Sequence, residues 1–153
     1  MIIQVNKQND ALVQSIKQQD TRLYEALRKS DRIEVPPLEI HGFGVSGDVA
    51  VGTSVFPPLI ITHAVKLVLA LLTFNTPPTG ADFQANIRKR STGASVLKAP
   101  IIFPAGFTGV IDRNEFAIDT FAKYDVLICD VLQVGSTVPG SYMNFYLLFD
   151  LVS

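Results

Sequence analysis

Hydrophobic residues recur with a seven-residue period in the first 34 residues of the chain. With Ile2 at the first position of a heptad, seven of the ten seam positions through Ile33 are apolar. A repeat sustained over more than four heptads is typical of a coiled coil. The seam residues that we expect to carry oligomerisation are Ile2, Val5, Leu12, Ile16, Leu23, Ala26 and Ile33.

Apolar residues beside the seam bear on the number of helices. Val13 and Leu27 widen the apolar stripe beyond a two-helix seam, which favours a parallel homotrimer, with a dimer as the alternative. A second alternative is an amphipathic helix that folds back onto its own domain. A helix of ~31 residues is ~46 Å long, more than a domain of about 120 residues easily covers. We therefore expect the coiled coil.

The composition changes sharply at Pro36. All nine prolines and all ten glycines lie at or after this residue. A double proline ends a helix because the residue before a proline is pushed out of the helical region. The sequence thus predicts a coiled-coil stalk or anchor over 1–34, a Pro/Gly neck with a first strand over 35–46, and a β-sandwich head over 47–153. The predicted fold class is α+β by segregation, a helical coiled coil followed by an all-β antiparallel sandwich.

Short β-rich runs alternate with turn residues from Leu38 onward. Runs separated by about ten residues are typical of a sandwich or jelly roll. The expected strands cover residues 38–43, 49–56, 59–63, 65–74, 82–90, 95–103, 115–121, 124–134 and 142–152. Two similar stretches, 68–87 and 126–148, each join an apolar run to an alternating run through a Pro/Gly loop, which predicts two hairpins facing each other across the sandwich.

The strand expected over 65–74 is apolar at both parities, which is typical of a central strand buried on both faces. Its successor alternates and ends in the basic triplet Arg88-Lys89-Arg90. We interpret this triplet as a solvated strand end, with binding of a phosphate or an acidic glycan as the alternative. Nucleic acid is disfavoured because no aromatic residues interleave with the charges, and residues from 35 on hold seven basic against nine acidic side chains.

Candidate catalytic patterns are weak. Gly42 to Gly47 matches GxGxxG, but a strand-like run follows where a dinucleotide loop needs a helix. His41 and His63 have no neighbours at metal-ligand spacing. Cys129 lies in an apolar run and is expected to be buried and inert. We expect no catalytic residue, no cofactor, no metal site and, because no apolar run reaches ~18 residues, no membrane insertion.

Residues 47–152 resemble a β-sandwich module of tailed-bacteriophage virion proteins. The resemblance lies in Pro78-Thr79-Gly80-Ala81 and in Gln133-Val134-Gly135-Ser136-Thr137 with Gly140. The sequence departs from the module at residues 90–94, where the basic triplet ends. The resemblance implies a non-enzymatic virion component, a trimeric tail fibre or appendage that is attached to other virion proteins through its N-terminal helix and displays its β head.

The resemblance leaves three alternatives open. One is an adhesin that binds a host glycan, another is a capsid decoration or cement protein, and the third is an enzyme that hydrolyses host polysaccharide. The residues that could face a ligand are Thr79, Gly80, Ser136, Thr137, Arg88 and Arg90.

Overall fold

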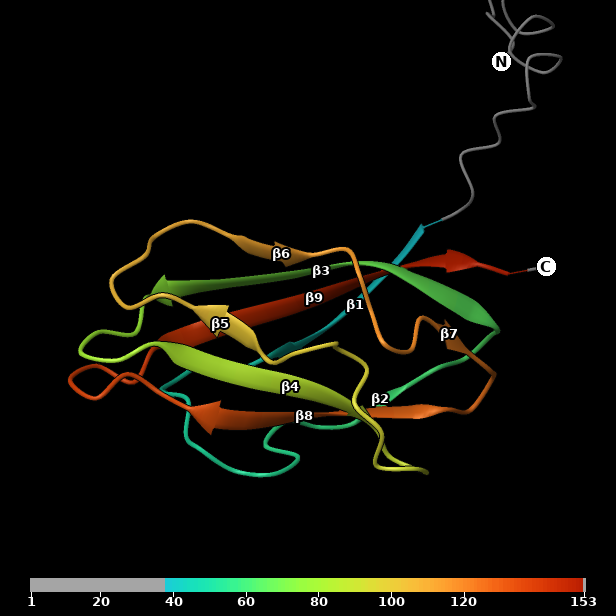
Figure 1. Ribbon diagram of the computed structural model, residues 1–153, viewed down its shortest axis with the longest axis horizontal. Helices are drawn as coiled ribbons and strands as arrows, with labels where there is room; N and C mark the ends of the chain where they lie inside the picture. Colours follow the sequence, from blue (N-terminus) through green and yellow to red (C-terminus); the bar gives the residue numbers. More distant parts are fainter. Residues whose placement is uncertain (1–37, 153) are drawn as a thin grey trace, which may run out of the picture. The chain divides into compact units, whose positions relative to one another are not determined.

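The computed structural model describes residues 38–152, and these residues are all β (Figure 1). The structure gives an all-β fold in place of the predicted α+β class: this part of the chain contains strands, as predicted for it, and no helix. Its turn-rich composition and short β-branched runs leave no stretch with helical periodicity. The coiled coil and its seam residues fall in 1–34, outside the described residues.

The strands form two antiparallel sheets. Sheet A has the order β1-β9-β3-β6, with β7 also paired to β3, and sheet B has the order β2-β8-β4-β5. The bounds are β1 (Leu38–Gly44), β2 (Leu59–Ile60), β3 (Val65–Thr76), β4 (Phe83–Lys89), β5 (Ile101–Phe103), β6 (Ile111–Arg113), β7 (Thr120–Phe121), β8 (Val126–Gln133) and β9 (Ser141–Leu151).

The pairing follows the plan of a jelly roll. β1 pairs with β9, β2 with β8, β3 with β6 and β4 with β5, so the first half of the region runs back along the second half as one long rolled hairpin. Rolling then brings β3 beside β9 and β4 beside β8. The antiparallel two-sheet part of the expectation is thus what the structure shows, and β1, placed with the neck by sequence, belongs to sheet A.

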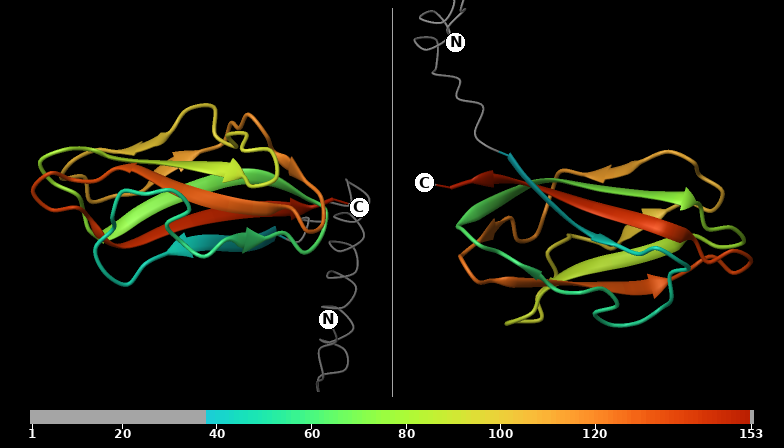
Figure 2. Two further views of the ribbon diagram at one scale, coloured as in Figure 1. Left: turned by 90° about the horizontal axis from the view of Figure 1, so that it is seen from below. Right: turned by 180° about the vertical axis from the view of Figure 1, so that it is seen from behind.

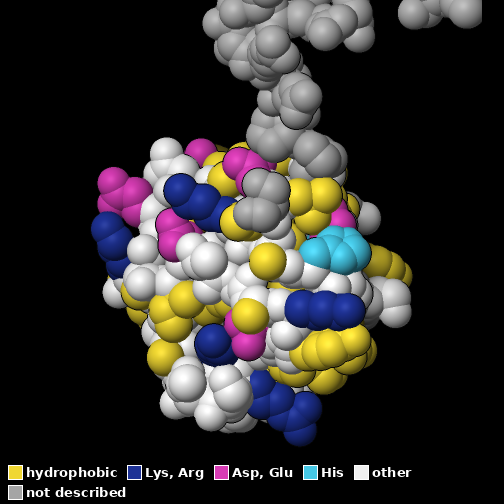
Figure 3. Space-filling view, turned by 90° about the vertical axis from the view of Figure 1, so that its right-hand side faces the viewer, with side chains coloured by type: hydrophobic (Ala, Val, Ile, Leu, Met, Phe, Trp, Pro, Cys, Tyr) yellow, Lys and Arg dark blue, Asp and Glu magenta, His cyan; other side chains and the backbone are white. Residues whose placement is uncertain are grey.

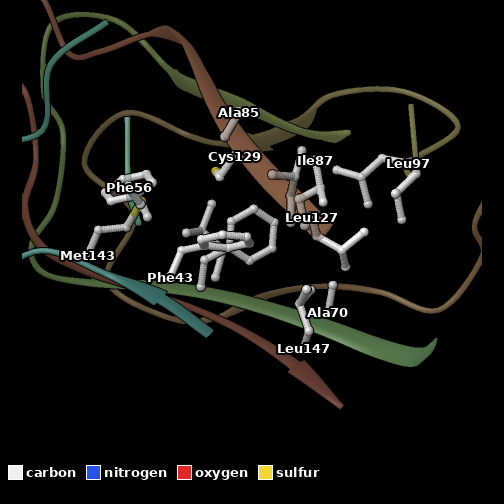
Figure 4. Packing of buried hydrophobic residues seen from close by; sticks show 14 of the residues in the cluster. Phe43, Phe56, Ala70, Ala85, Ile87, Leu97, Leu127, Cys129, Met143 and Leu147 are labelled. Carbon is white, nitrogen blue, oxygen red and sulfur yellow. The ribbon is translucent and has the colours of Figure 1, made fainter. Parts of the chain in front are cut away.

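Side chains that alternate along the strands fill the space between the sheets (Figure 4). Leu72, Phe145 and Leu147 of sheet A and Ile87 and Leu127 of sheet B are fully buried there. Cys129 is also fully buried in this layer, and desolvation raises the pKa of its thiol well above the ordinary range. The expected burial of this cysteine is confirmed, and the raised pKa agrees with low reactivity because the thiolate is the reactive form.

A β-bulge explains why β3 is apolar at both parities. The register with β9 shifts between Leu67 and Leu69, so Val65 and Leu67 face the core before the bulge and Ala70 and Leu72 face it afterwards. The opposite face of β3 is only partly buried. β3 is central in its sheet, as predicted, but the prediction that both of its faces are buried is wrong because a bulge inverts the alternation.

The two predicted hairpins are instead two arches between the sheets. β3 lies in sheet A and β4 in sheet B, while β8 lies in sheet B and β9 in sheet A. Residues 77–82 form the first arch and residues 134–140 form the second. They lie together at one end of the sandwich, the arch end, and β1 begins and β9 ends at the opposite, terminal end (Figures 1 and 2).

Four expected strands are much shorter or absent. Of 59–63 only β2 is a strand. Residues 49–56 form only an isolated bridge, Gly52 with Val131, because Gly52 and a left-handed Ser54 interrupt the run. Of 95–103 only β5 is a strand, and of 115–121 only β7 is one. β6 is not among the expected strands, and it pairs with β3.

Candidate functional site

The structure divides the six residues proposed to face a ligand into two groups. Thr79 and Gly80 of the first arch contact Ser136 and Thr137 of the second at the arch end. Arg88 and Arg90 lie at the other end of β4, near Val126. β4 has seven residues and therefore spans roughly 20 Å. One ligand site formed by all six residues is excluded by this separation.

The two arches interlock through their backbones. The Thr79 amide donates to the Val138 carbonyl at 2.9 Å, and the Thr79 carbonyl accepts from the Thr137 amide at 3.0 Å. The Pro78 carbonyl accepts from the Gly106 amide at 2.8 Å, which ties in the loop after β5. Each of these bonds satisfies a backbone group that would otherwise lack a partner in an irregular segment.

Glycine is required where the arches meet. A Cβ on Gly135 would lie 1.9 Å from the Val138 carbonyl oxygen and 2.7 Å from the Thr79 amide nitrogen. Gly80 has φ +84°, and a Cβ there would lie 2.4 Å from Ser136 Oγ. These glycines belong to the motifs that carry the resemblance to virion modules, so the motifs have a structural reason in the close approach of the arches.

The basic triplet is largely paired within the fold. Arg88 Nε and Nη2 both donate to the Asp130 carboxylate, with 3.1 Å between Nη2 and Oδ1. The Ser54 amide also donates to Asp130 Oδ1, at 2.8 Å. Lys89 Nζ lies 3.1 Å from Asp125 Oδ2. Arg88 and Lys89 therefore stabilise sheet B and are not free to bind a ligand, and the interpretation of the triplet as a wholly solvated strand end needs this correction.

Asp130 is the acidic centre of this network. It is 8% exposed and sits on the outer face of β8, diagonally across from Arg88. The hydrogen bonds from Arg88 lower the pKa of the Asp130 carboxyl, aided by the Ser54 amide and opposed by desolvation. The carboxylate therefore stays charged and paired at neutral pH.

Arg90 differs from its two neighbours. Its amide donates to the Val126 carbonyl at 2.8 Å, and its side chain is exposed. Within residues 38–152, its guanidinium forms no salt bridge. Figure 3, which views the terminal end, shows acidic, basic and apolar side chains interspersed. This end therefore has single charges and lacks the continuous basic stripe that a nucleic acid needs.

The GxGxxG match and the two histidines, which were the candidate catalytic patterns, have structural roles. Gly42 and Gly44 lie inside β1, and a Cβ on Gly42 would be 2.8 Å from the Phe145 carbonyl oxygen, so this glycine serves strand packing. His41 Nε2 lies 3.2 Å from Glu39 Oε2, and His63 Nε2 lies 2.9 Å from Oε1 of the same residue. The two imidazole rings contact different oxygens of the Glu39 carboxylate. The three side chains therefore form two separate pairwise contacts and do not converge on one point.

Metal and membrane sites are not found in the described part of the chain. Across residues 38–152, no group of three or more His, Cys, Asp and Glu side chains is arranged to hold a metal ion. The same residues include no helix of the length and hydrophobicity needed to cross a bilayer.

Sequence reasoning missed Tyr124. This residue precedes β8, its side chain is 69% exposed, and its backbone has φ +74°. It lines an open pocket together with Arg90, Ser91, Asp125 and Val126. No local pattern reveals such a site, because a left-handed tyrosine is set by contacts from distant segments and not by its neighbours in sequence.

The comparisons with known proteins assign neither a family nor a function to the chain. No protein-family model and no curated protein matches the chain. A solved structure described as "Structure of infectious bursal disease virus Gx strain" is 12% identical, with a TM-score of 0.29, over 76% of this chain and 37% of that chain. The chain spans little more than a third of that protein's length, and likeness at this level assigns no function.

Replacing Gly135 with Ala tests the interlock. The added methyl group collides with backbone of both arches, so we expect a loss of about 2–4 kcal/mol in the free energy of unfolding. Gly47→Ala is the matched control, because a Cβ at Gly47 meets nothing within 4 Å, and it should change stability by less than ~0.5 kcal/mol. Urea denaturation measures both. Equal effects would show that the arches do not hold each other.

Replacing Arg88 and Arg90 separately tests their different roles. Arg88→Ala leaves Asp130 without its cation and should cost about 2 kcal/mol at neutral pH. Arg90→Ala should stay within ~0.5 kcal/mol of the wild type. The Asp130 pKa is lowered in the folded state, so the stabilisation is present at neutral pH and is lost as the pH falls through that lowered pKa. Denaturant titrations at neutral and acidic pH should show the gap between Arg88→Ala and the wild type shrinking in acid; a gap that is constant with pH would contradict the pairing.

Proposed function

We propose that the protein is a non-enzymatic structural component of a bacteriophage virion, a homotrimer that is attached through residues 1–34 and displays the β sandwich. The resemblance of residues 47–152 to virion modules supports this proposal. The jelly-roll strand order agrees with it by analogy, since this architecture is frequent in viral capsid and lectin domains. One fold can serve many functions, so the strand order alone is weak support for this function. The side chains on the surface of the sandwich provide the stronger support.

The observation that carries the proposal is an apolar outer face on sheet A. Ile40, Leu148 and Leu69 form one cross-strand row, and Tyr146 and Leu71 form the next. Ile40 is 63% exposed and Tyr146 is 41% exposed. Neighbours in such rows lie about 5 Å apart, so the five side chains make one continuous patch.

Polar residues border this apolar face on both sides. Lys66 pairs in register with Asp150 toward the terminal end, and Thr73 pairs with Asn144 toward the arch end. An apolar centre with a polar rim is the usual composition of a surface that packs against another protein. A head that assembles with other virion subunits through sheet A fits this surface.

The ends of the sandwich support a displayed head. Leu38, where the described region begins, is paired with Asp150 at the terminal end, while the interlocked arches close the opposite end. The chain therefore enters the sandwich at the end opposite the arches, which suits attachment through the residues that precede Leu38.

Variants of sheet A test the assembly of the protein into particles. The double variant Ile40→Lys/Tyr146→Lys should reduce its copy number in purified virions at least about tenfold, the effect of losing ~1.4 kcal/mol of association energy. Val51→Lys/Leu132→Lys is the matched control, because Val51 and Leu132 are 59% and 48% exposed and neither belongs to sheet A. Quantitative mass spectrometry of particles gives the copy number, and thermal melting confirms that each variant is folded.

Cryo-EM of the same particles locates the protein. Density with the arch end outward supports a fibre or appendage, and density with sheet A flat against capsid subunits identifies a decoration protein instead. Absence of the wild-type protein from purified virions contradicts the proposal. Equal copy numbers for the sheet A variant and its control would show that the apolar face is not the assembly surface.

A further inference from the structure

An open pocket at the terminal end combines an exposed aromatic ring with an unpaired cation. Arg90, Ser91, Tyr124, Asp125 and Val126 line the pocket, which has a volume of about 370 Å³. This volume is within the range of small-molecule sites. The residues come from the loop after β4 and from the segment that leads into β8, so the fold brings together two segments far apart in sequence.

Tyr124 is held in place by its backbone while its ring remains in solvent. The Tyr124 amide donates to the Ile61 carbonyl at 2.6 Å, and the Asp125 amide donates to the Ala122 carbonyl at 3.1 Å. These bonds fix Tyr124 at φ +74°, a region that bulky side chains rarely adopt. The surrounding structure thus maintains a strained position that exposes an aromatic ring at the pocket edge, and strain of this kind concentrates at binding sites.

The pocket has one cation without an acidic partner. Asp125 pairs with Lys89, at 3.1 Å, and also accepts from the Ala122 amide. Arg90 has no acidic partner among residues 38–152. Lys123, which does not line the pocket, places its Nζ 4.8 Å from the centre of the Tyr124 ring. An unpaired guanidinium beside a carboxylate that is already paired favours an anionic ligand.

We infer that this pocket binds an anionic sugar, a saccharide unit with a carboxylate or phosphate group. The ring of Tyr124 packs against the apolar face of the sugar, and the planar guanidinium of Arg90 pairs with the anionic group in bidentate fashion. Ser91 adds a hydroxyl for hydrogen bonds to the ligand. The site does not depend on where the protein is located in a virion. It lies opposite the arches and contains Arg90, one of the six residues that the sequence named as possible ligand-facing positions.

A sugar fits these residues better than a nucleic acid does. Proteins that bind single strands stack successive bases on several aromatic residues along a basic groove. Here one tyrosine and one arginine line the pocket. The end of the sandwich on which they lie carries charges of both signs (Figure 3). The pocket therefore matches one ring-shaped anionic unit.

NMR titration of the full chain tests the site. N-acetylneuraminic acid is the carboxylated probe, glucose 6-phosphate is the phosphorylated probe, and glucose, inorganic phosphate and an oligothymidylate are the comparison ligands. One or both acidic sugars should shift the amide signals of Ser91, Tyr124 and Val126 in a saturable way. Glucose and inorganic phosphate should bind at least about tenfold more weakly, because each offers only one of the two interactions.

Two variants separate binding from folding. Tyr124→Asn removes the ring at a position where Asn tolerates the left-handed backbone, and Arg90→Gln removes the charge. Each should weaken acidic-sugar binding about tenfold or more. Tyr142→Asn is the matched control, since Tyr142 is also exposed, has φ +51° and lies outside the pocket; it should leave binding unchanged.

Four results would overturn the inference. No saturable shift with either acidic sugar would exclude the site, as would shifts that persist in both pocket variants. Inorganic phosphate binding as tightly as the sugars would show a simple anion site without sugar recognition. Saturation by oligothymidylate at lower concentration than either sugar would identify a nucleic-acid site. Each outcome is independent of particle incorporation, so this test and that of the proposed function fail separately.

Discussion

The backbone contact between the two arches is the constraint on which the described structure depends. β3 and β9 pair within sheet A and β4 and β8 pair within sheet B, and the two arches are the short links that carry the chain between these pairs. The bonds of Thr79 with Thr137 and Val138 hold both links together. A slip of either pair by one residue would move the arches apart and turn core side chains outward.

Because the arches pack tightly against each other, the two ends of the sandwich differ in the space that they leave for a ligand. The arch end is committed to close backbone packing, and Gly80 and Gly135 are too tightly placed there to leave room for a ligand between the loops. The terminal end has the exposed ring of Tyr124 and the free guanidinium of Arg90. Between the ends, Arg88 and Asp130 fix the outer face of sheet B, while the outer face of sheet A has apolar rows with polar borders. The interlocked arches, the proposed ligand pocket and the proposed assembly face therefore lie on different surfaces.

Sequence periodicity could predict the single strands but not their partners. Alternation from Phe83 to Ile87 correctly indicated a half-buried strand, and the apolar surroundings of Cys129 correctly indicated burial. The bulge after Leu67 inverted the alternation of β3, which no local pattern distinguishes from burial on both faces. Arches and hairpins share the same strand-loop-strand signature, so the pairing of β3 with β9 was not predictable. The position of Tyr124 depends on a hydrogen bond to Ile61, more than sixty residues earlier, so it could not be predicted from local sequence either. The heptad pattern before residue 35 remains a prediction outside the described residues.

Native-state hydrogen exchange tests the interlock most directly. Thr79 and Thr137 donate backbone hydrogen bonds across the arches, whereas Gly93 donates one of 2.8 Å within a single exposed loop, to Lys89. If the arches hold the sandwich together, the amides of Thr79 and Thr137 exchange only through global unfolding, with the same free energy as core amides such as that of Phe145, in β9 between β1 and β3. The amide of Gly93 then exchanges by local opening at a much lower free energy. Exchange of Thr79 and Thr137 as fast as that of Gly93 would contradict the account.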